Sequence, residues 1–388
     1  LKMITTKNNE HKKLNVPNLR FKEFQGEWNS FLINDVCSEF KSGKNIKADS
    51  ISESGEYPVY GGNGLRGYTA SYNHEGLYVL IGRQGALCGN VRSVYGKTYI
   101  TEHAIAVAGN EKSNTNFLHY LFLKMNLGQY SDQSAQPGLA VNKLLKLKVA
   151  LPIISEQTKI AKLLSLLDER IATQNKIIED LKMLKSAIIE KVFNGKHSEK
   201  LQLNDVGSYI RGLTYSSNDV VEHGGTLVMR SNNIINGSLL DYNNNVVFVN
   251  KQMSAEQQLQ DGDVVICMAN GSSSLVGKSS FYDGSCHSPI TVGAFCGIYR
   301  SKESIVKWLF QTNKYRRYIW NSLQGGNGAI ANLNGEDILN MSFSIPNATI
   351  KDTCVKMLTS VDSALENNMS LCALYTLQKQ HLLRQMFI

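Results

Sequence analysis

The chain has 388 residues, of which 42% are hydrophobic, and a formal net charge of +8 at pH 7. This length favours two or three domains rather than one, and the apolar fraction suffices for packed cores, which argues against general disorder. The excess of basic residues permits a polyanionic partner without requiring one.

The cysteines and the apolar runs bear on the compartment. The seven cysteines are odd in number and include no Cys-x-x-Cys pair, which indicates buried thiols in a reducing compartment rather than disulfides or a zinc site. The longest apolar runs, such as residues 264–269, fall far short of the roughly 18 residues that a membrane span needs. No basic-then-apolar leader opens the chain, so we expect a cytoplasmic protein with no membrane partner.

Short runs of β-forming residues, separated by glycines, predict two blocks of strands. In the first block the clearest runs are 78–81 and 98–100, and in the second they are 246–249 and 264–268. The two blocks also begin and end alike, which indicates an internal repeat. Similar segments open them at 28–36 and 201–206, and apolar stretches at 144–151 and 338–345 each lead to a proline.

A long helix is predicted to follow each block. After the first block, Pro152 ends the preceding strand, and Ser155 is placed to cap the first helical turn. Asn194-Gly195 offers this helix a left-handed exit. From Ser155 to Phe193 the helix has 39 residues, about 58 Å at roughly 1.5 Å per residue.

The two helical segments align without a gap at an offset of 194 residues, which places Pro346 opposite Pro152 and the cap candidate Thr349 opposite Ser155. Identities are few, but both segments carry an apolar position every three or four residues, the 3.5-residue seam of a coiled coil. The predicted seam comprises Leu164, Leu167, Ile171, Gln174, Ile178, Leu181 and Ile188 in the first helix, and Leu358, Val361, Leu365, Asn368, Tyr375 and Leu382 in the second.

Polar residues interrupt both seams at the same two places, Gln174/Asn368 and Lys185/Lys379. Such positions usually lower stability and fix register or orientation. We therefore predict an α+β fold in which two α/β domains with mixed or antiparallel sheets are joined by two long helices. If these helices pair as an antiparallel coiled coil, the chain has pseudo-twofold symmetry. The alternative is that each helix packs separately on its own domain.

Three motifs with catalytic associations do not fit their chemistry. The segment 271–279 resembles a phosphate-binding loop, but it has one residue too many between its glycines, and the chain after it looks extended. The glycine-rich turn 60–64 loosely fits adenosylmethionine-dependent methyltransferases, yet an extended run follows where a helix is needed. Residues 39–41 supply the acidic-x-Lys element of restriction nucleases without the Pro-Asp that should precede it.

The remaining candidates for catalysis are isolated. His103 and His287 stand apart from any plausible nucleophile or ligand cluster, so we interpret both as structural histidines with satisfied hydrogen bonds. The sequence supports no enzyme active site and no metal site.

Two glycine-rich regions, one in each block, combine amide and guanidinium side chains. Arg pairs with guanine edges and Asn or Gln with adenine edges in the major groove, while glycines let backbone amides approach phosphates. Turn geometry alone is the alternative explanation for any single residue. Basic residues at 314–317 beside aromatic side chains would suit phosphate contacts or form a solvated helix face. The candidate DNA contacts are Lys44, Asn63, Arg66, Arg83, Gln84, Arg92, Arg211, Tyr215, Arg230, Asn232, Asn233, Asn270, Ser272, Lys278, Arg316, Arg317 and Asn327.

Several short motifs occur in a definite order along the chain. They are PNLRF at 17–21 with Phe24, Gly26 and Trp28, then YGGNG at 60–64, IGRQG at 81–85 and DGDVVI at 261–266, with a proline-led helix closing each half. Each motif is weak alone, but their order and the duplication are specific. On these residues the chain resembles the specificity subunit of type I restriction-modification systems over essentially its full length.

The resemblance implies two target-recognition domains, each of which recognises one half of a split, asymmetric DNA sequence, and two helices that set the spacer between the halves. The implied division is a polar tail at 1–18, a recognition domain at 19–151, a spacer helix at 152–195, a second recognition domain at 196–345 and a second spacer helix at 346–388. The second helix departs slightly from the pattern, since it is poorer in charge and has Cys372 and Tyr375 in its seam.

The resemblance also implies the partners. Double-stranded DNA with a bipartite target would bind to this chain together with two modification subunits, which bind S-adenosylmethionine and methylate adenine. Restriction subunits would join them and use ATP and Mg to translocate and cut DNA. The chain itself would be non-catalytic and bind no cofactor. The alternatives are a coiled-coil interaction scaffold without DNA recognition, or the DNA-binding fragment of a methyltransferase-endonuclease.

Overall fold

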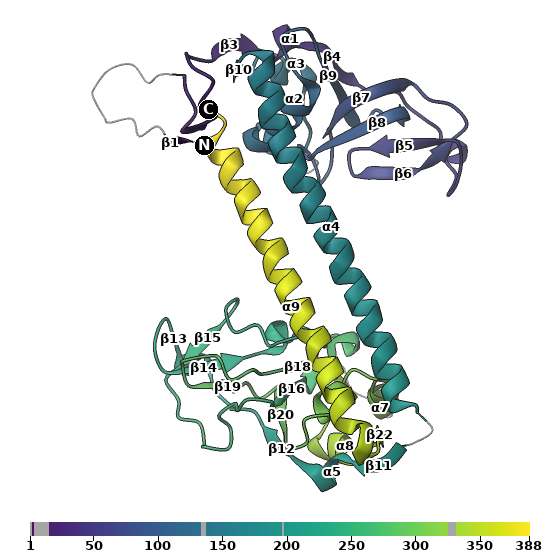
Figure 1. Ribbon diagram of the computed structural model, residues 1–388, viewed down its shortest axis with the longest axis vertical. Coiled ribbons are helices and arrows are strands. Elements are labelled where there is room, and N and C mark those ends of the chain that lie inside the picture. Colours follow the sequence, from purple (N-terminus) through teal and green to yellow (C-terminus); the bar gives the residue numbers. More distant parts are fainter. Residues whose placement is uncertain (1, 4–14, 133–136, 196–197, 325–330) are drawn as a thin grey trace. The chain divides into compact units, whose positions relative to one another are not determined.

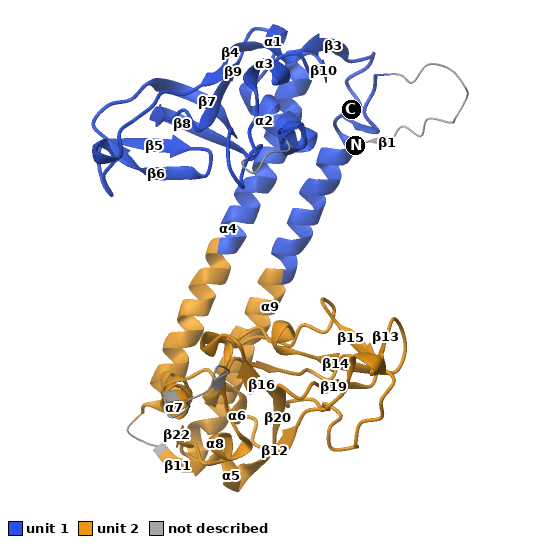
Figure 2. Cartoon of the chain, turned by 180° about the vertical axis from the view of Figure 1, so that it is seen from behind, with its two compact units in different colours: residues 1–175, 370–388 blue, residues 176–369 orange. Residues whose placement is uncertain are grey.

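The computed structural model describes residues 2–3, 15–132, 137–195, 198–324 and 331–388 (Figure 1). The chain divides into two compact units (Figure 2). Unit 1 comprises residues 1–175 and 370–388, and unit 2 comprises residues 176–369. Each of the two long helices therefore contributes one part to each unit.

Unit 1 is built on a six-stranded sheet with the order β4-β9-β7-β8-β5-β6. Neighbouring strands are antiparallel except β8 and β5, which pair in parallel. The fully buried stretch at the end of β7 explains why residues 78–81 are a clear strand signal in the sequence. The strands of this sheet are β4 (Cys37–Ser42), β5 (Tyr57–Gly61), β6 (Gly64–Thr69), β7 (His74–Gly82), β8 (Val91–Ile100) and β9 (Ala104–Gly109).

Helix α2 (Thr115–Met125) packs against β7, β8 and β9. The side chain of Asn114 caps the first turn of α2, and the helix's own Phe117 and Phe122 are fully buried. Phe117 stacks on Phe387 from the end of the chain, which ties the C-terminus into this core. The other elements of unit 1 are β1 (Lys2–Met3), β2 (Leu19–Arg20), β3 (Asn29–Leu32), α1 (Ile33–Val36), η1 (Ala48–Ser50), η2 (Leu127–Tyr130), α3 (Val141–Leu144) and β10 (Lys148–Leu151), which pairs with β3.

Unit 2 contains two four-stranded sheets, β12-β20-β16-β18 and β13-β15-β14-β19. Their strands are β12 (Gly207–Arg211), β13 (Val220–Val221), β14 (Thr226–Met229), β15 (Val247–Val249), β16 (Val264–Cys267), β18 (Ser279–Phe281), β19 (Ile290–Val292) and β20 (Cys296–Ser301). The remaining elements are β11 (Ser198–Gln202), α5 (Leu203–Val206), η3 (Ser217–Asp219), η4 (Ser231–Asn233), β17 (Ala269–Asn270), η5 (Ser273–Leu275), α6 (Val306–Leu309), α7 (Asn313–Gln324), β21 (Ala331–Asn332), α8 (Gly335–Leu339) and β22 (Ser342–Pro346).

The two units repeat one topology. The antiparallel order β4-β9-β7-β8 of unit 1 reappears as β12-β20-β16-β18 in unit 2. Each unit also has one parallel pair: β5 with β8 extends the sheet of unit 1, whereas β14 with β19 belongs to the second sheet of unit 2. The edge pair β3–β10, which leads into the first long helix, corresponds to β11–β22, which leads into the second. The internal repeat expected from the sequence is confirmed and extends through the domains.

The long helices are α4 (Ile154–Phe193) and α9 (Ala348–Gln385). None of the predicted seam positions is exposed, whereas the charged positions between them are mostly exposed. Within unit 1 the paired residues run in opposite directions, since Asp168 contacts Lys379, Arg170 contacts Tyr375 and Asn175 contacts Cys372. The predicted antiparallel pairing holds in this unit.

The lysine that interrupts the seam of α4 lies in a buried polar cluster of unit 2. Lys185 Nζ is 2.6 Å from the carboxylate of Asp362, which also accepts a 2.9 Å hydrogen bond from Trp308 Nε1 of α6. We call Lys185, Asp362 and Trp308 the unit 2 clasp. It joins both long helices to the body of unit 2.

Unit 1 contains the counterpart at an offset of 194 residues. Asp168 of α4 accepts hydrogen bonds from Lys379 Nζ of α9 at 2.5 Å and from Tyr120 Oη of α2 at 2.8 Å. We call these three residues the unit 1 clasp. The seam lysines therefore have a structural reason: each pairs with the aspartate of the partner helix, beside an aromatic donor from the domain.

The helix ends differ from the predicted ones. Both helices begin earlier than expected, so Ser155 and Thr349 lie inside the first turn rather than before it. The carbonyls of Ile153 and Asn347 accept the first helical hydrogen bonds instead. The left-handed exit at Asn194-Gly195 was also wrong, because neither residue has a positive φ. The four predicted strand runs all lie in or overlap strands, but 144–151 forms β10 only from Lys148 onward.

Candidate nucleic-acid interface

A concavity of about 520 Å³ in unit 2 gathers several of the predicted DNA contacts. It forms where β14 ends, opposite the turn that precedes β20. Arg230 and Asn232 are exposed, and Tyr215 is half-buried beside Gly293. The described lining residues, none of them acidic, are Tyr215, Arg230, Ser231, Asn232, Gly293, Ala294, Phe295 and Cys296.

Asn233 has a structural role instead of the predicted base contact. The residue is only 1% exposed. Its Oδ1 accepts from the backbone N–H of Arg230 at 2.9 Å, and its Nδ2 donates to the carbonyls of Asp241 and Asn244. These bonds stabilise the short η4 turn, in which the side chains of Arg230 and Asn232 are exposed and the amide of Asn233 is buried.

The loop after β16 adjoins this concavity. Asn270 donates through Nδ2 to Ser231 Oγ at 3.2 Å and accepts from the backbone N–H of Ser272 at 3.0 Å. Ser272 is exposed and Lys278 is half-buried. Strand β21 pairs with β17 at this loop. The structure thus brings Asn270 and Ser272 close to the η4 turn.

The other predicted contacts of unit 2 lie elsewhere or outside the described residues. Arg211, at the end of β12, is exposed. Arg316 and Arg317 are exposed on α7 together with Trp320, while Tyr315 is buried and bonds to the Gly277 carbonyl. Asn327 falls outside the part of the chain that the structure describes.

In unit 1 the predicted contacts surround the turn between β5 and β6. A Cβ added at Gly64, where φ is +107°, would meet the guanidinium of Arg92 at 2.6 Å, so only glycine lets this arginine lie across the turn. A Cβ at Gly61 would touch the Arg66 side chain at 3.0 Å. Asn63, Arg66 and Arg92 are exposed.

Two further segments adjoin this turn. Arg83 is half-buried, and its backbone N–H donates to the carbonyl of His103. The Gln84 side chain contacts His103 Nδ1 at 3.1 Å, and Lys44 forms a parallel bridge with Thr101. Gln84 and Lys44 are both exposed. The six candidates of unit 1 therefore lie in or beside the loops that connect neighbouring strands of its sheet around the β5–β6 turn, and their contacts with DNA remain predictions.

Sequence reasoning missed two exposed side chains at these sites, Phe295 and His103. Phe295 is largely exposed and lines the same concavity as Arg230, and His103 is half-exposed beside Gln84. His103 is paired through both ring nitrogens, to Gln84 and Glu102, as expected for a satisfied histidine, but it lies among the candidates. In the sequence, the one feature that could have indicated these two positions is that each directly precedes a run of apolar residues that forms a buried strand.

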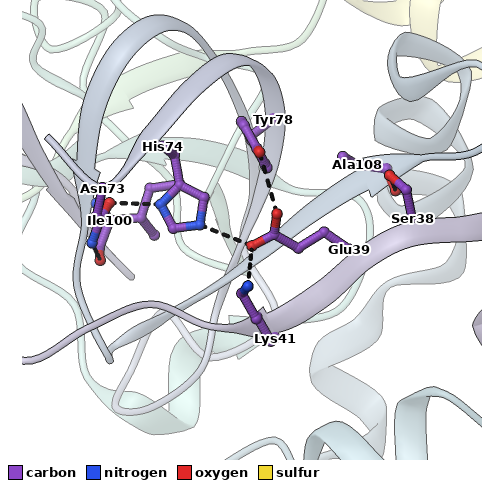
Figure 3. A network of polar contacts seen from close by, with 8 residues as sticks. All are labelled: Ser38, Glu39, Lys41, Asn73, His74, Tyr78, Ile100 and Ala108. Carbon is purple, nitrogen blue, oxygen red and sulfur yellow. Dashed lines mark hydrogen bonds and ion pairs between the residues drawn. The ribbon is translucent and has the colours of Figure 1, made fainter.

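The acidic-x-Lys element belongs to a polar network at the end of the sheet (Figure 3). Glu39 accepts from Lys41 Nζ at 3.1 Å and Tyr78 Oη at 3.2 Å, and its Oε1 is 3.0 Å from His74 Nε2. Burial alone would raise the pKa of Glu39, but hydrogen bonds from Lys41 and His74 outweigh it and lower the pKa. This arrangement ties β4 to β7, and the described residues contain no cluster of three potential metal ligands.

The two glycine-rich motifs take the extended forms expected of them. The segment 271–279 passes through the short turn η5 and enters strand β18 rather than a helix. The turn 60–64 is a hairpin whose second strand is β6. Neither has the helix N-terminus that would hold a phosphate or nucleotide. Among the described residues no helix is long and apolar enough to cross a membrane.

Comparisons with known proteins agree on one family. The sequence model of the type I restriction modification DNA specificity domain matches residues 25–183 and 196–371. The EcoprrI specificity subunit of Escherichia coli is 43% identical over 154 residues, which are 39% of this chain and 38% of that protein. A putative type I specificity subunit of Haemophilus influenzae is 29% identical over 144 residues, 36% of this chain and 37% of that protein. The matches thus span under two-fifths of these curated relatives.

The fold comparison covers almost the whole chain. The crystal structure of the type I restriction-modification S subunit from M. genitalium superposes with a TM-score of 0.70. The superposition covers 96% of this chain and 99% of that one, at 15% sequence identity. The shared fold supports the predicted fold class of two α+β domains with two long helices.

Proposed function

Because this chain belongs to the type I restriction modification DNA specificity domain family, we propose that it is the sequence-recognition subunit of a complex that methylates and cleaves DNA. One observation carries the proposal: two domains of the same topology each present guanidinium and amide side chains on equivalent loops. Such a pair of domains suits a target in two different halves. Each domain would recognise one half of a bipartite, asymmetric sequence.

The chemistry of the candidate side chains fits double-stranded DNA. Arginines such as Arg66 and Arg230 can donate two hydrogen bonds to a guanine edge, and Asn232 can pair with adenine. The exposed arginines of α7 suit phosphate oxygens, which position the protein without specifying sequence. The net charge of +8 favours association through counterion release.

The long helices would serve as the spacer. Continuous helices of 40 and 38 residues are stiff on the scale of one to two DNA turns. The clasps attach a domain to both helices within each unit, so the helices would define the number of unrecognised base pairs between the half-sites.

We further propose the division of labour within the complex. This chain would be non-catalytic and cytoplasmic, and it would bind two modification subunits and the restriction subunits. S-adenosylmethionine, ATP and Mg would be bound by those partners.

The proposal is tested by the salt dependence of DNA binding. The chain, assembled with its modification partner, is titrated against a fluorescent duplex library at 50 and 200 mM salt. We expect affinity to fall by about 10³-fold, since several phosphates must be neutralised. Arg230→Gln should weaken binding or relax the sequence preference. Lys302→Gln, an exposed change at the opposite end of β20 from Phe295, is the matched control and should do neither. Salt-insensitive association without sequence preference would instead indicate an interaction scaffold.

A further inference from the structure

Phe295 of unit 2 and His103 of unit 1 occupy the same position in the repeated topology. The carbonyl of His103 accepts from the backbone N–H of Arg83 at 2.9 Å, just after β7. The carbonyl of Phe295 accepts from Met268 at the same distance, just after the equivalent strand β16. Each residue directly precedes the strand beside β7 or β16, namely β9 or β20.

A second set of bonds confirms the equivalence. The N–H of Gly43 donates to the carbonyl of Ala104, the residue after His103, and the N–H of Gly212 donates to Cys296, the residue after Phe295. An added Cβ would lie 2.2 Å from the Ile100 carbonyl oxygen at Gly43 and 2.2 Å from the Gly293 carbonyl oxygen at Gly212. The backbone framework around this position is therefore the same in both units, and the side chain is what differs.

The framework fixes the backbone of Phe295, while its side chain is largely exposed to solvent. Its carbonyl accepts from both Met268 and Ala269, and Cys296 N–H closes a turn onto the Gly293 carbonyl at 2.8 Å. The side chain is nevertheless 69% exposed and lines the concavity with Arg230 and Asn232. An aromatic side chain has only two χ angles, so from a fixed backbone position it can contact a base edge at a low cost in side-chain entropy.

We propose that Phe295 is a specificity-determining residue that packs against the C5-methyl group of a thymine in the half-site recognised by unit 2. The methyl group is the one apolar feature of the major groove, and phenylalanine is among the side chains suited to it. The inference rests on the proposed DNA-recognition function. The equivalent position of unit 1 carries His103, a polar ring held by Gln84, so the two domains differ in chemistry at the same point of contact.

The test removes the methyl group from the DNA and the ring from the protein. Duplexes carrying the preferred target have each thymine of the unit 2 half-site replaced in turn by deoxyuridine, which lacks only the methyl group. With the assembled complex, one replacement should weaken binding about fourfold, the factor expected for burying one methyl group. Phe295→Ala should lose this dependence at the same position, and Phe295→Leu should retain part of it.

Two controls separate a specific effect from a general one. Tyr95→Ala removes the most exposed aromatic ring of unit 1, on β8, and should leave every deoxyuridine effect unchanged. Because the Phe295 side chain is mostly exposed, Phe295→Ala should unfold at the same temperature as the wild-type chain.

The outcomes are distinguishable from failure of the proposed function. If the wild-type complex shows no preferred sequence, DNA recognition itself is wrong. If it shows one, but no deoxyuridine replacement weakens binding, or the same replacement weakens binding of Phe295→Ala equally, the assignment of Phe295 is overturned.

Discussion

Replacing Lys185 with Met should destabilise the chain far more than replacing Lys379 with Met. In the unit 2 clasp the side chains of Lys185 and Asp362 are 8% and 7% exposed. In the unit 1 clasp those of Lys379 and Asp168 are 20% and 37% exposed. Water therefore screens the unit 1 pair much more strongly, although the two pairs occupy equivalent positions.

The expected magnitudes follow from burial. Removing one partner of a buried ion pair costs about 3–5 kcal/mol, because the remaining charge is left uncompensated. Asp362 would retain the hydrogen bond from Trp308 and the nearby charge of Lys307. We therefore expect the lower end of the range for Lys185→Met, about 3 kcal/mol. For Lys379→Met we expect about 1 kcal/mol or less, as for a partly exposed pair.

Urea unfolding of the full chain, followed by tryptophan fluorescence, measures the difference. Two of the three tryptophans, Trp308 and Trp320, lie in unit 2, so the signal reports mainly on that unit. Adding Asp362→Asn to Lys185→Met should recover part of the loss, because the buried charge is then gone. Equal losses for the two lysine variants, or a loss below about 0.5 kcal/mol for Lys185→Met, would refute the reasoning.

Three further predictions concern pH, packing and the spacer. Burial and the charge of Lys379 lower the pKa of His119 to about 4. Between pH 6.5 and 5 the unfolded chain takes up a proton that the folded chain excludes, so the free energy of unfolding should fall by about 1.6 kcal/mol. Urea unfolding at both pH values measures this loss, which should be smaller in His119→Asn. Gly212→Ala places a Cβ 2.2 Å from the Gly293 carbonyl oxygen and should lower the free energy of unfolding by more than about 2 kcal/mol. Gly271→Ala, where a Cβ has nothing within 4 Å, is the control and should change the urea midpoint little. Equal effects of the two substitutions would contradict the close approach of Gly212 to Gly293. Inserting seven residues into both long helices lengthens each by about 10 Å and preserves the seam. The preferred spacer should therefore grow by about three base pairs, and binding should weaken because the second half-site also rotates by about 100° around the DNA axis. An unchanged spacer in methylation mapping would show that the helices do not set the spacer length.

Periodicity and internal repetition predicted the long-range features well. The 3.5-residue seam and the offset of 194 residues are properties of the chain itself, so helices, antiparallel pairing in unit 1 and duplicated domains could all be inferred. Strand order could not, because it depends on pairing between segments far apart, such as β4 with β9. The helix starts were missed because Ile153 and Asn347, rather than the cap candidates Ser155 and Thr349, are the residues that precede the first helical residue.

The candidate site shows the same division. Residue type and glycine content located the turns that carry Arg66 and Arg230, since these are local features. Asn233 was misassigned because only the folded turn reveals that its amide is used internally. The partners of Lys185 and Lys379 also escaped detection: Asp362 and Asp168 lie outside the apolar seam, so the seam pattern alone does not connect them to the lysines.

The most direct test of the central claim is methylome sequencing of a host that expresses this chain with its modification partner. We predict one new split motif with methyladenine on both strands, and loss of one half of that motif when residues 199–345 are replaced by those of another family member. If the complex assembles and no new methylated motif appears, the chain is not the sequence-recognition subunit proposed here.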